Sequence, residues 1–384
     1  MAQQPWGASP NSASVPGVAP PPPRKETVRI AFHHQEGLLG LTVINFLLSI
    51  VTLGIYSFWG KTAIRQHIWS SIHINDEPLE YTGTGWELFL GALIVGLLIL
   101  VPLAFLQIFA SFLFTASSTI ATVVQIAVSI FVLFLVGIGT YRARRYRLSR
   151  SVWRGIRGSL AGSPVRFGTS FLFRYAMLVP TLGWAYPWLR VGLNRHITND
   201  MRFGQHPFHF RGTAAPLYMP FATVWIGGAI IIAVIAGLSW GTVDFDLLFG
   251  GDDSDPYQSQ RQGLIVLGIV LIGLPIFFVI SGLLWVVYKA AELRYFADCT
   301  TFGDLQFRLN ATVWSLITLT LGNIFIMLFT LGIGRPFVQR RLIRYVVARL
   351  ETDGTVDIAA IQQSQQQLDR SGEGLAEAFD IDGF

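Results

Sequence analysis

Four apolar stretches decide what kind of fold this chain can adopt. They run over residues 87–110, 120–141, 217–240 and 263–288, and their interiors contain no Asp, Glu, Lys, Arg or His. A helix of about 20 residues crosses the roughly 30 Å hydrocarbon layer of a bilayer. Only 13% of the residues in the chain are charged, whereas soluble domains carry roughly 25%. The sequence therefore predicts an integral membrane protein with at least four spanning helices.

A Thr-Leu-Gly motif marks a break in three further apolar runs, at residues 52–54, 181–183 and 330–332. Proline removes a backbone donor and kinks a helix, and Pro180 and Pro187 flank the second motif. We predict three broken helices whose breaks lie at the motif glycines, which are Gly54, Gly183 and Gly332.

The surroundings of the motif indicate internal repeats. The second copy lies 181 − 52 = 129 residues after the first, and the third lies 330 − 52 = 278 residues after it. At these offsets, identical or similar residues meet at polar and aromatic positions: Trp59 and Trp188, His67 and His196, Lys61 and Arg190, and Asn45 and Asn323. Shared hydrophobicity explains matching leucines but not these pairs, so we predict two full repeats and a truncated third.

These repeats suggest how the chain is divided. We predict a disordered Pro-rich tail, three membrane repeats and an acidic, Gln-rich disordered tail, over residues 1–28, 29–166, 167–310, 311–350 and 351–384. The first tail lacks apolar residues to bury. It also lacks the basic start and apolar core of a secretory signal.

The charges of the loops predict the topology. Cytoplasmic loops of membrane proteins are rich in Lys and Arg. The loops around the four long stretches are basic, except for the acidic loop at 241–262 and the uncharged linker at 111–119. We therefore predict that both termini are cytoplasmic. The three Thr-Leu-Gly elements have basic flanks on both sides, which leaves two alternatives: they re-enter or lie at the interface, or they cross, giving four to seven spans.

Three polar loops alternate apolar and polar residues around a turn, at residues 70–83, 199–212 and 300–309. Period-two alternation around Gly, Asn or Asp is typical of a β-hairpin. A single hairpin is marginally stable, so several could pair into one small cytoplasmic sheet. The predicted fold class is an all-α integral membrane protein with internal repeats and small cytoplasmic β-hairpins.

Four segments together resemble a known family: 52–61, 80–89, 153–157 and 372–379. They are similar to the bacterial YjgN family of inner-membrane proteins, and the resemblance extends from about residue 29 to residue 384. It implies a multi-pass protein of the bacterial inner membrane and supplies no activity. The Pro-Trp usual after the break is Phe58-Trp59 in the first copy, so proline is not obligatory there.

We expect no enzymatic activity, cofactor or metal. His206 and His209 lie in a strand-like segment without nearby Cys or carboxylate partners, so hairpin side chains are favoured over a zinc site. The single cysteine, Cys299, excludes an intrachain disulfide. The Arg-rich segment 141–166 follows a span, so we expect contact with anionic lipids at the cytoplasmic face rather than nucleic acid. Association into a homo-oligomer stays open.

Twelve positions are candidates for a functional role because they lie at the breaks, recur between repeats or are polar within apolar runs. They are Arg174, Asn45, Asn323, Gly54, Gly183, Gly332, Trp59, Trp188, Lys61, Arg190, His67 and His196. The favoured hypothesis is a non-enzymatic protein that organises or senses the membrane. The alternative is a channel or uncoupled transporter of a small neutral or anionic solute, in which Arg174 would face a cavity. An enzyme acting on lipid is the least favoured.

Overall fold

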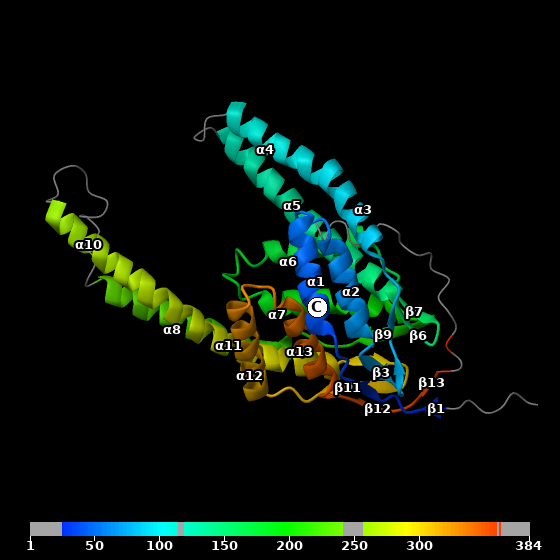
Figure 1. Cartoon of the computed structure of the whole chain (residues 1–384). Coiled ribbons are helices and arrows are strands. Elements are labelled where there is room, and N and C mark those ends of the chain that lie inside the picture. The colour runs from blue at the N-terminus through cyan, green and yellow to red at the C-terminus, as the bar shows by residue number, and fades with distance from the viewer. Residues whose placement is uncertain (1–24, 114–118, 241–255, 359–360, 362–384) are drawn as a thin grey trace, which may run out of the picture.

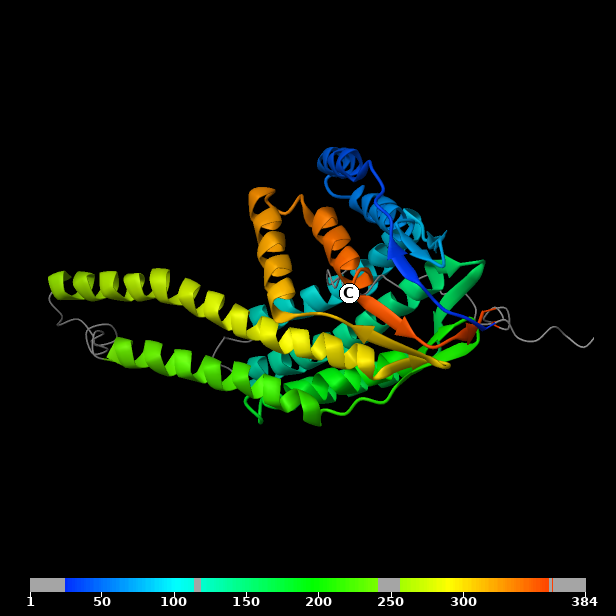
Figure 2. The ribbon, with the colours of Figure 1, turned by 90° about the horizontal axis from the view of Figure 1, so that it is seen from below.

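The computed structural model describes residues 25–113, 119–240, 256–358 and 361. Strands gather on one side of the molecule, and two long helical hairpins extend away from them (Figure 1). Three shorter helical hairpins lie near the strands, and they do not all run parallel to the long ones. Figure 2 shows α12 and α13 standing upright while α8 and α11 run to the left.

The long hairpins contain the four predicted spans. The first hairpin consists of α3 (Gly85–Val95), a π-helical turn η1 (Gly96–Leu100), α4 (Val101–Leu113) and α5 (Thr119–Arg150). The second consists of α8 (Ala215–Trp240), α10 (Pro256–Gly268), η2 (Ile269–Gly273) and α11 (Leu274–Asp298). Four helical stretches are long and apolar enough to cross a membrane: Gly85–Phe109, Thr122–Arg150, Ala215–Gly237 and Gly263–Asp298. The prediction of four spanning helices is confirmed at the level of length and composition.

Each Thr-Leu-Gly motif joins two short helices. The three pairs are α1 (Leu38–Val51) with α2 (Ser57–Trp69), α6 (Pro164–Ala176) with α7 (Tyr186–Asp200), and α12 (Val313–Phe329) with α13 (Arg335–Val347). At 1.5 Å per residue, the 14 residues of α1 give about 21 Å, which is shorter than the roughly 30 Å hydrocarbon layer. Most of these helices are therefore shorter than an ordinary span, and α12, with 17 residues, lies at the lower limit.

The strands form one antiparallel sheet with two small companions. The eight-stranded sheet has the order β12-β11-β10-β9-β8-β7-β6-β5, which is a simple meander along the chain. Its members are β5 (Glu80–Tyr81), β6 (Ser151–Trp153), β7 (Ile156–Leu160), β8 (Met201–Phe203), β9 (His206–Phe210), β10 (Thr300–Phe302), β11 (Leu305–Leu309) and β12 (Leu350–Asp353). The companions are β2 (Ile30–Phe32) with β3 (Ile72–Ile74) and β4 (Glu77–Pro78), and β1 (Lys25–Glu26) with β13 (Val356–Asp357).

Every helical hairpin is inserted between two strands that pair with each other. For the short hairpins, the strand residues that face each other at the insertion are Phe32 and Ile72, Leu160 and Met201, and Leu309 and Leu350. For the long hairpins they are Tyr81 and Ser151, and Phe210 and Thr300. Because paired residues are neighbours, each hairpin leaves the sheet and returns to it at the same place. All five hairpins therefore start and end on the sheet side of the molecule.

The sheet is curved around its own apolar core. Trp153 of β6, Phe302 of β10 and Leu305 of β11 pack together there with Val356 of the companion strand β13. They border a cavity of about 250 Å³ whose lining is almost wholly apolar. Burying one large apolar side chain contributes roughly 1.5–3 kcal/mol, so this core anchors the strand ends from which the helical hairpins emerge.

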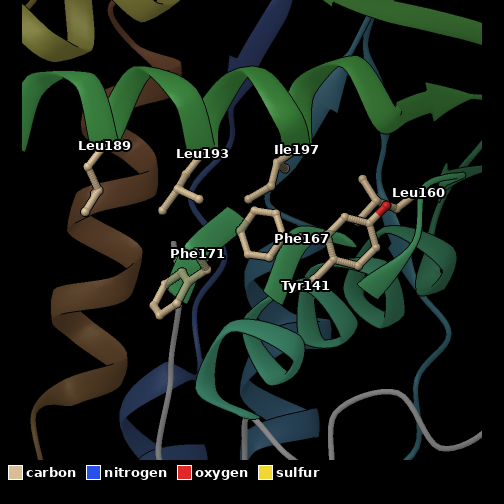
Figure 3. Close-up of a cluster of buried hydrophobic side chains, with 7 residues drawn as sticks. All are labelled: Tyr141, Leu160, Phe167, Phe171, Leu189, Leu193 and Ile197. Carbon is tan, nitrogen blue, oxygen red and sulfur yellow. The ribbon is translucent and has the colours of Figure 1, made fainter. Parts of the chain in front are cut away.

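A second core fixes the central short hairpin to the first long one. Leu189, Leu193 and Ile197 lie along one face of α7 and point toward Phe167 and Phe171 of α6 (Figure 3). Their four-residue spacing places them on one helical stripe. Tyr141 of α5 completes the cluster. The short hairpin α6/α7 is therefore a packed element of the molecule.

The structure corrects the fold class. The chain is mostly helical but not all-α, because its sheets are more extensive than the small one expected. The predicted hairpins at 199–212 and 300–309 belong to the eight-stranded sheet, whereas β3 and β4 of the first predicted hairpin belong to the three-stranded sheet. The hairpin β6/β7 and the strands β1, β2, β12 and β13 were not expected. The strands β1 and β13 lie within the predicted tails, and β12 runs from the last residue of the predicted third repeat into the second tail. Strands of two to four residues show little periodicity, so the local sequence does not reveal them. Val28, Ile358 and Ile361 of these predicted tails pack into the apolar core, so the tails are not disordered there. Residues 1–24, 359–360 and 362–384 lie outside the described residues.

Candidate functional site

The Thr-Leu-Gly turn has the same hydrogen bonds in all three short hairpins. The threonine hydroxyl donates to the carbonyl four residues earlier, at 2.6–2.7 Å, and accepts from the N–H four residues later. In the first hairpin these partners are the Leu48 carbonyl and the Tyr56 N–H. Thr52, Thr181 and Thr330 therefore end one helix and start the next.

Leucine and glycine complete the turn in the left-handed region. The leucine φ angles are 51°, 49° and 50°, and the glycine φ angles are 91°, 83° and 90°. A left-handed conformation costs a non-glycine residue roughly 1–2 kcal/mol. At Gly54, Gly183 and Gly332 a side chain would therefore be strained. The three glycines lie at the helix breaks, as predicted.

The leucine of each turn is a large apolar side chain that is almost fully exposed. Leu53, Leu182 and Leu331 are 93%, 77% and 90% exposed. An aqueous turn would place Gly, Asn or Asp at a left-handed position, but here the chain accepts strain to present a large apolar side chain. Many apolar side chains on α1 and α12 are also exposed, such as Leu47 and Phe325. The tips therefore have the chemistry of a lipid-facing surface.

In the first two hairpins, a polar residue on the first helix contacts the second helix. Arg174 lies 174 − 45 = 129 residues after Asn45, so both occupy the same position relative to the motif. Asn45 donates to the Gly60 carbonyl at 3.3 Å, and Arg174 donates to the Trp188 carbonyl at 3.1 Å. The Arg174 guanidinium also stacks on the Trp188 ring, 4.1 Å from its centroid.

These polar contacts are tightly packed. A Cβ at position 192 would lie 2.1 Å from the Arg174 guanidinium carbon, so Gly192 leaves room for that side chain. Asn323 occupies the same position in the third hairpin, and its side-chain oxygen is buried without a hydrogen-bond partner among the described residues. Arg174 therefore holds two helices together.

The two tryptophans that recur between hairpins pack differently. Trp59 lies among Tyr56, Trp86 and Phe89, which joins α2 to the base of α3. Trp188 contacts Phe173 in addition to Arg174, so it joins α7 to α6.

Lys61 and Arg190 occupy one repeat position but have different surroundings. Arg190 donates to Glu292 of α11 at 2.6 Å, and Lys289 bonds the other oxygen of the same carboxylate at 2.5 Å. The Glu292 side chain is only 2% exposed. Lys61 instead lines a pocket between α2 and α13. One cation therefore neutralises a buried carboxylate, and the other faces a cavity.

The paired histidines are packing residues. His196 lies edge-on to Phe167, with its Nε2 3.8 Å from the Asp200 carboxylate. Burial lowers the pKa of His196, and burial together with the nearby Arg340 lowers the pKa of His67. Both rings are therefore neutral at pH 7. Among the described residues, no group of three or more His, Cys, Asp or Glu side chains could hold a metal ion.

Sequence reasoning missed two carboxylates that hold helices together, the partly buried Glu87 and the buried Glu292. Glu87 at the start of α3 accepts from the Tyr146 hydroxyl at 2.7 Å and from Arg150 at 2.5 Å, which ties α3 to α5. Glu292 lies beyond the uncharged part of its span. Its position three residues after Lys289 could have suggested an ion pair within α11. Its other partner, Arg190, lies 102 residues away in the sequence and could not have been found in this way.

Comparison with known proteins gives a family and one partial relative. Residues 27–378 match the family described as "Bacterial protein of unknown function (DUF898)". The inner membrane protein YjgN of Salmonella typhimurium is 34% identical over 67 residues, which is 17% of this chain and 17% of that protein. The matched region thus spans less than a fifth of the relative. No solved structure matches.

Proposed function

This chain belongs to the bacterial DUF898 family, which includes proteins of the YjgN type, and we propose that it is a non-enzymatic protein that organises the cytoplasmic leaflet of the inner membrane. Its two long hairpins cross the bilayer. Its three short hairpins enter the cytoplasmic leaflet without crossing. The curved sheet lies in the cytoplasm with both termini.

One observation carries this proposal. Each short hairpin begins and ends at a pair of facing strand residues, such as Leu160 and Met201, and has an exposed leucine at its turn. The common starting side argues against a single crossing, and the apolar tip favours lipid over water. The basic flanks that follow each turn suit the cytoplasmic face. A hairpin of this kind occupies one leaflet and displaces its lipids.

Internal duplication is part of the proposal. The shared turn hydrogen bonds and the shared position of Asn45, Arg174 and Asn323 support descent of the three short hairpins from one unit. With three copies of the short hairpin, one protein would insert into the cytoplasmic leaflet at three points around its two spanning hairpins.

The geometry gives the transport alternative less support. Arg174 contacts Ser170 and Trp188 on its own hairpin, where a transporter would use it to line a passage. The described pocket along α3, η1 and α4 is lined by apolar side chains such as Phe89 and Leu97. Flux through this protein would need a polar path.

Cysteine accessibility tests the insertion of the tips. Cys299 is first replaced by Ser, and single cysteines are then placed at Leu53, Leu182 or Leu331. We expect the three tips to resist a membrane-impermeant maleimide from both faces. A cysteine at Asp304, in a turn of the sheet, is the matched control and should label from the cytoplasmic face. Labelling of any tip from the periplasmic face would show that the hairpin crosses and would refute the proposal.

Lipid order tests the organising role. In vesicles that carry the purified protein, an acyl-chain order probe should report a disturbed leaflet. A triple variant with Ser at positions 53, 182 and 331 should insert its spans normally and lose this disturbance. An equal signal from the triple variant and the natural protein would count against the role.

A further inference from the structure

The strands close around the apolar cavity of the sheet core. The three-stranded sheet β2-β3-β4 is separate from the eight-stranded sheet, but hydrogen bonds tie it to strands near both ends of that sheet. The indole N–H of Trp153 in β6 donates to the carbonyl of Ile74 in β3 at 3.2 Å. The hydroxyl of Thr352 in β12 donates to the carbonyl of Val28, just before β2. The two sheets therefore surround one interior space, as strands do in barrels that hold a ligand.

This cavity is larger than a packing defect. Its volume is about 250 Å³, whereas protein interiors are close-packed and contain few voids larger than a water molecule. An apolar cavity of about 150 Å³ in another protein stays dry and binds small apolar molecules such as benzene. The larger cavity of the sheet core can therefore take up an apolar ligand without displacing ordered water.

The lining excludes a polar ligand from the interior. It is almost wholly apolar and includes the rings of Trp153, Phe203, Phe208 and Phe302. Ser151 is the only hydroxyl residue of the described lining, and its Oγ already accepts from the Trp69 indole and donates to the Arg147 carbonyl, both at 2.8 Å. Burying a polar group without a partner is costly. The part of a ligand that enters the cavity must therefore be hydrocarbon.

The volume of the cavity suits one acyl chain. A water molecule occupies about 30 Å³ in the liquid, and a methylene group is of similar size. The cavity therefore accommodates about eight methylene groups, which is the chain of a ten-carbon fatty acid. The two longer chains of a phospholipid would not fit.

Arg202 of β8 indicates the charge of the head group. Of the described lining residues it alone is charged, and it is exposed, whereas its neighbour Phe203 packs into the sheet core. Successive side chains of a strand point to opposite faces, so the guanidinium lies outside the apolar wall. The head of a bound chain must also remain outside, in water. An arginine at that place favours a carboxylate, with which it forms charge-assisted hydrogen bonds.

We propose that the cavity of the sheet core binds a fatty acid, with its single acyl chain inside and its carboxylate in water beside Arg202. This site lies in the sheet rather than in the short hairpins. It goes beyond the proposed function and does not depend on whether the hairpin tips enter the cytoplasmic leaflet.

Chain length provides the first test. Decanoate and shorter and longer fatty acids are titrated by calorimetry into the full chain in nanodiscs, with empty nanodiscs as the reference. Each buried methylene should raise the affinity about fourfold from hexanoate to decanoate, and dodecanoate should add little because the cavity is full. A signal that equals that of empty nanodiscs at every chain length would refute the site.

Filling the cavity provides the second test. Ile74→Phe and Val28→Phe each enlarge a lining side chain, so each should weaken decanoate binding at least tenfold and melt no earlier than the natural protein. The matched control is Ile44→Phe, because Ile44 is exposed on α1, and it should bind decanoate normally. Unchanged binding by both filled variants would overturn the site.

The third test examines the head group and does not alter the core. Arg202→Gln should weaken decanoate at least fivefold and leave decanol unchanged, whereas Arg308→Gln, at an exposed arginine on β11, should change neither. Equal binding of decanoate by Arg202→Gln and the natural protein would refute the carboxylate assignment. A parallel loss of decanol would refute it too, because it would assign Arg202 a structural role.

The chain itself could supply another occupant. If decanoate binds only after residues 362–384 are removed, the C-terminal segment fills the cavity and the fatty-acid proposal is overturned. The cysteine labelling of the hairpin tips is independent of all these titrations. Protected tips without decanoate binding would refute this inference and leave the proposed function standing.

Discussion

The second short hairpin and the first differ in what their shared cation contacts. Both have the same turn, with a threonine that bonds the helix before it and the helix after it. Arg190 of α7 is bonded to the buried Glu292 of a spanning helix, whereas Lys61 of α2 lines a pocket with Arg65 and Arg335. One repeat position thus joins two parts of the protein in one case and faces a cavity in the other.

Two residues that occupy the same position in a repeat, such as Lys61 and Arg190, therefore need not have the same role. The turn is a local structure, so the same residues produce it three times. The partner of a charged side chain is set by whichever element packs against it. For Arg190 that element is α11, and for Lys61 it is α13.

The largest expected effect separates Arg190 from Lys61. Arg190→Met leaves Glu292 buried with only Lys289, and we expect a loss of about 2–3 kcal/mol of stability. This is less than the roughly 3–5 kcal/mol for breaking a fully buried pair, because Arg190 is 39% exposed. The matched change Lys61→Met is at a partly exposed position and should cost less, about 0–1 kcal/mol. Thermal unfolding of both variants in nanodiscs measures the two losses of stability. Equal losses would show that Arg190 and Lys61 contribute alike.

A smaller effect distinguishes Arg174 from Asn45. Arg174→Ala removes a hydrogen bond and a cation–π contact with Trp188, so we expect it to cost about 1.5–3 kcal/mol. Asn45→Ala removes one hydrogen bond and should cost about 1 kcal/mol. The same unfolding assay applies. A larger loss for Asn45→Ala would show that the stacking on Trp188 contributes little.

The turn itself should behave alike in the hairpins. Gly54→Ala, Gly183→Ala and Gly332→Ala each place a side chain at a φ between 83° and 91°, so each should cost about 1–2 kcal/mol. Gly228→Ala is the control, because that glycine lies within α8 with open space around its Cβ, and alanine favours a helix. A cost confined to one of the three turns would contradict their equivalence.

The smallest effect is a dependence on pH. The folded-state pKa values of His67 and His196 lie below the ordinary value of 6.5, so the unfolded chain takes up protons first as the pH falls. Stability should be full above pH 6.5 and decline below it until the folded rings also titrate. Melting temperatures between pH 7.5 and 5 measure this. His67→Gln/His196→Gln should flatten the slope, and an unchanged slope would assign it to other groups.

Much of the fold could be predicted because its signals are local. The uncharged length of 120–141 predicts a span, and the alternation around Gly303 predicts the hairpin β10/β11. The break at Gly183 follows from its flanking prolines and was found in the structure. The β6/β7 hairpin escaped notice because Trp153, Arg154 and Gly155 lie in a segment dominated by arginine. The sheet that unites these hairpins has no local signal.

The sequence by itself determined the four spanning helices, the three breaks and most of the short hairpin strands, because hydrophobic length, turn residues and periodicity act over a few residues. Only the tertiary structure decided that each short hairpin returns to the strand pair from which it starts, as between Leu309 and Leu350. It also decided that Arg190 bonds Glu292 while Lys61 lines a pocket with Arg335. These outcomes depend on which distant segments pack together, and a contact across 102 residues is fixed by the burial of the whole sheet and its hairpins rather than by the residues beside it.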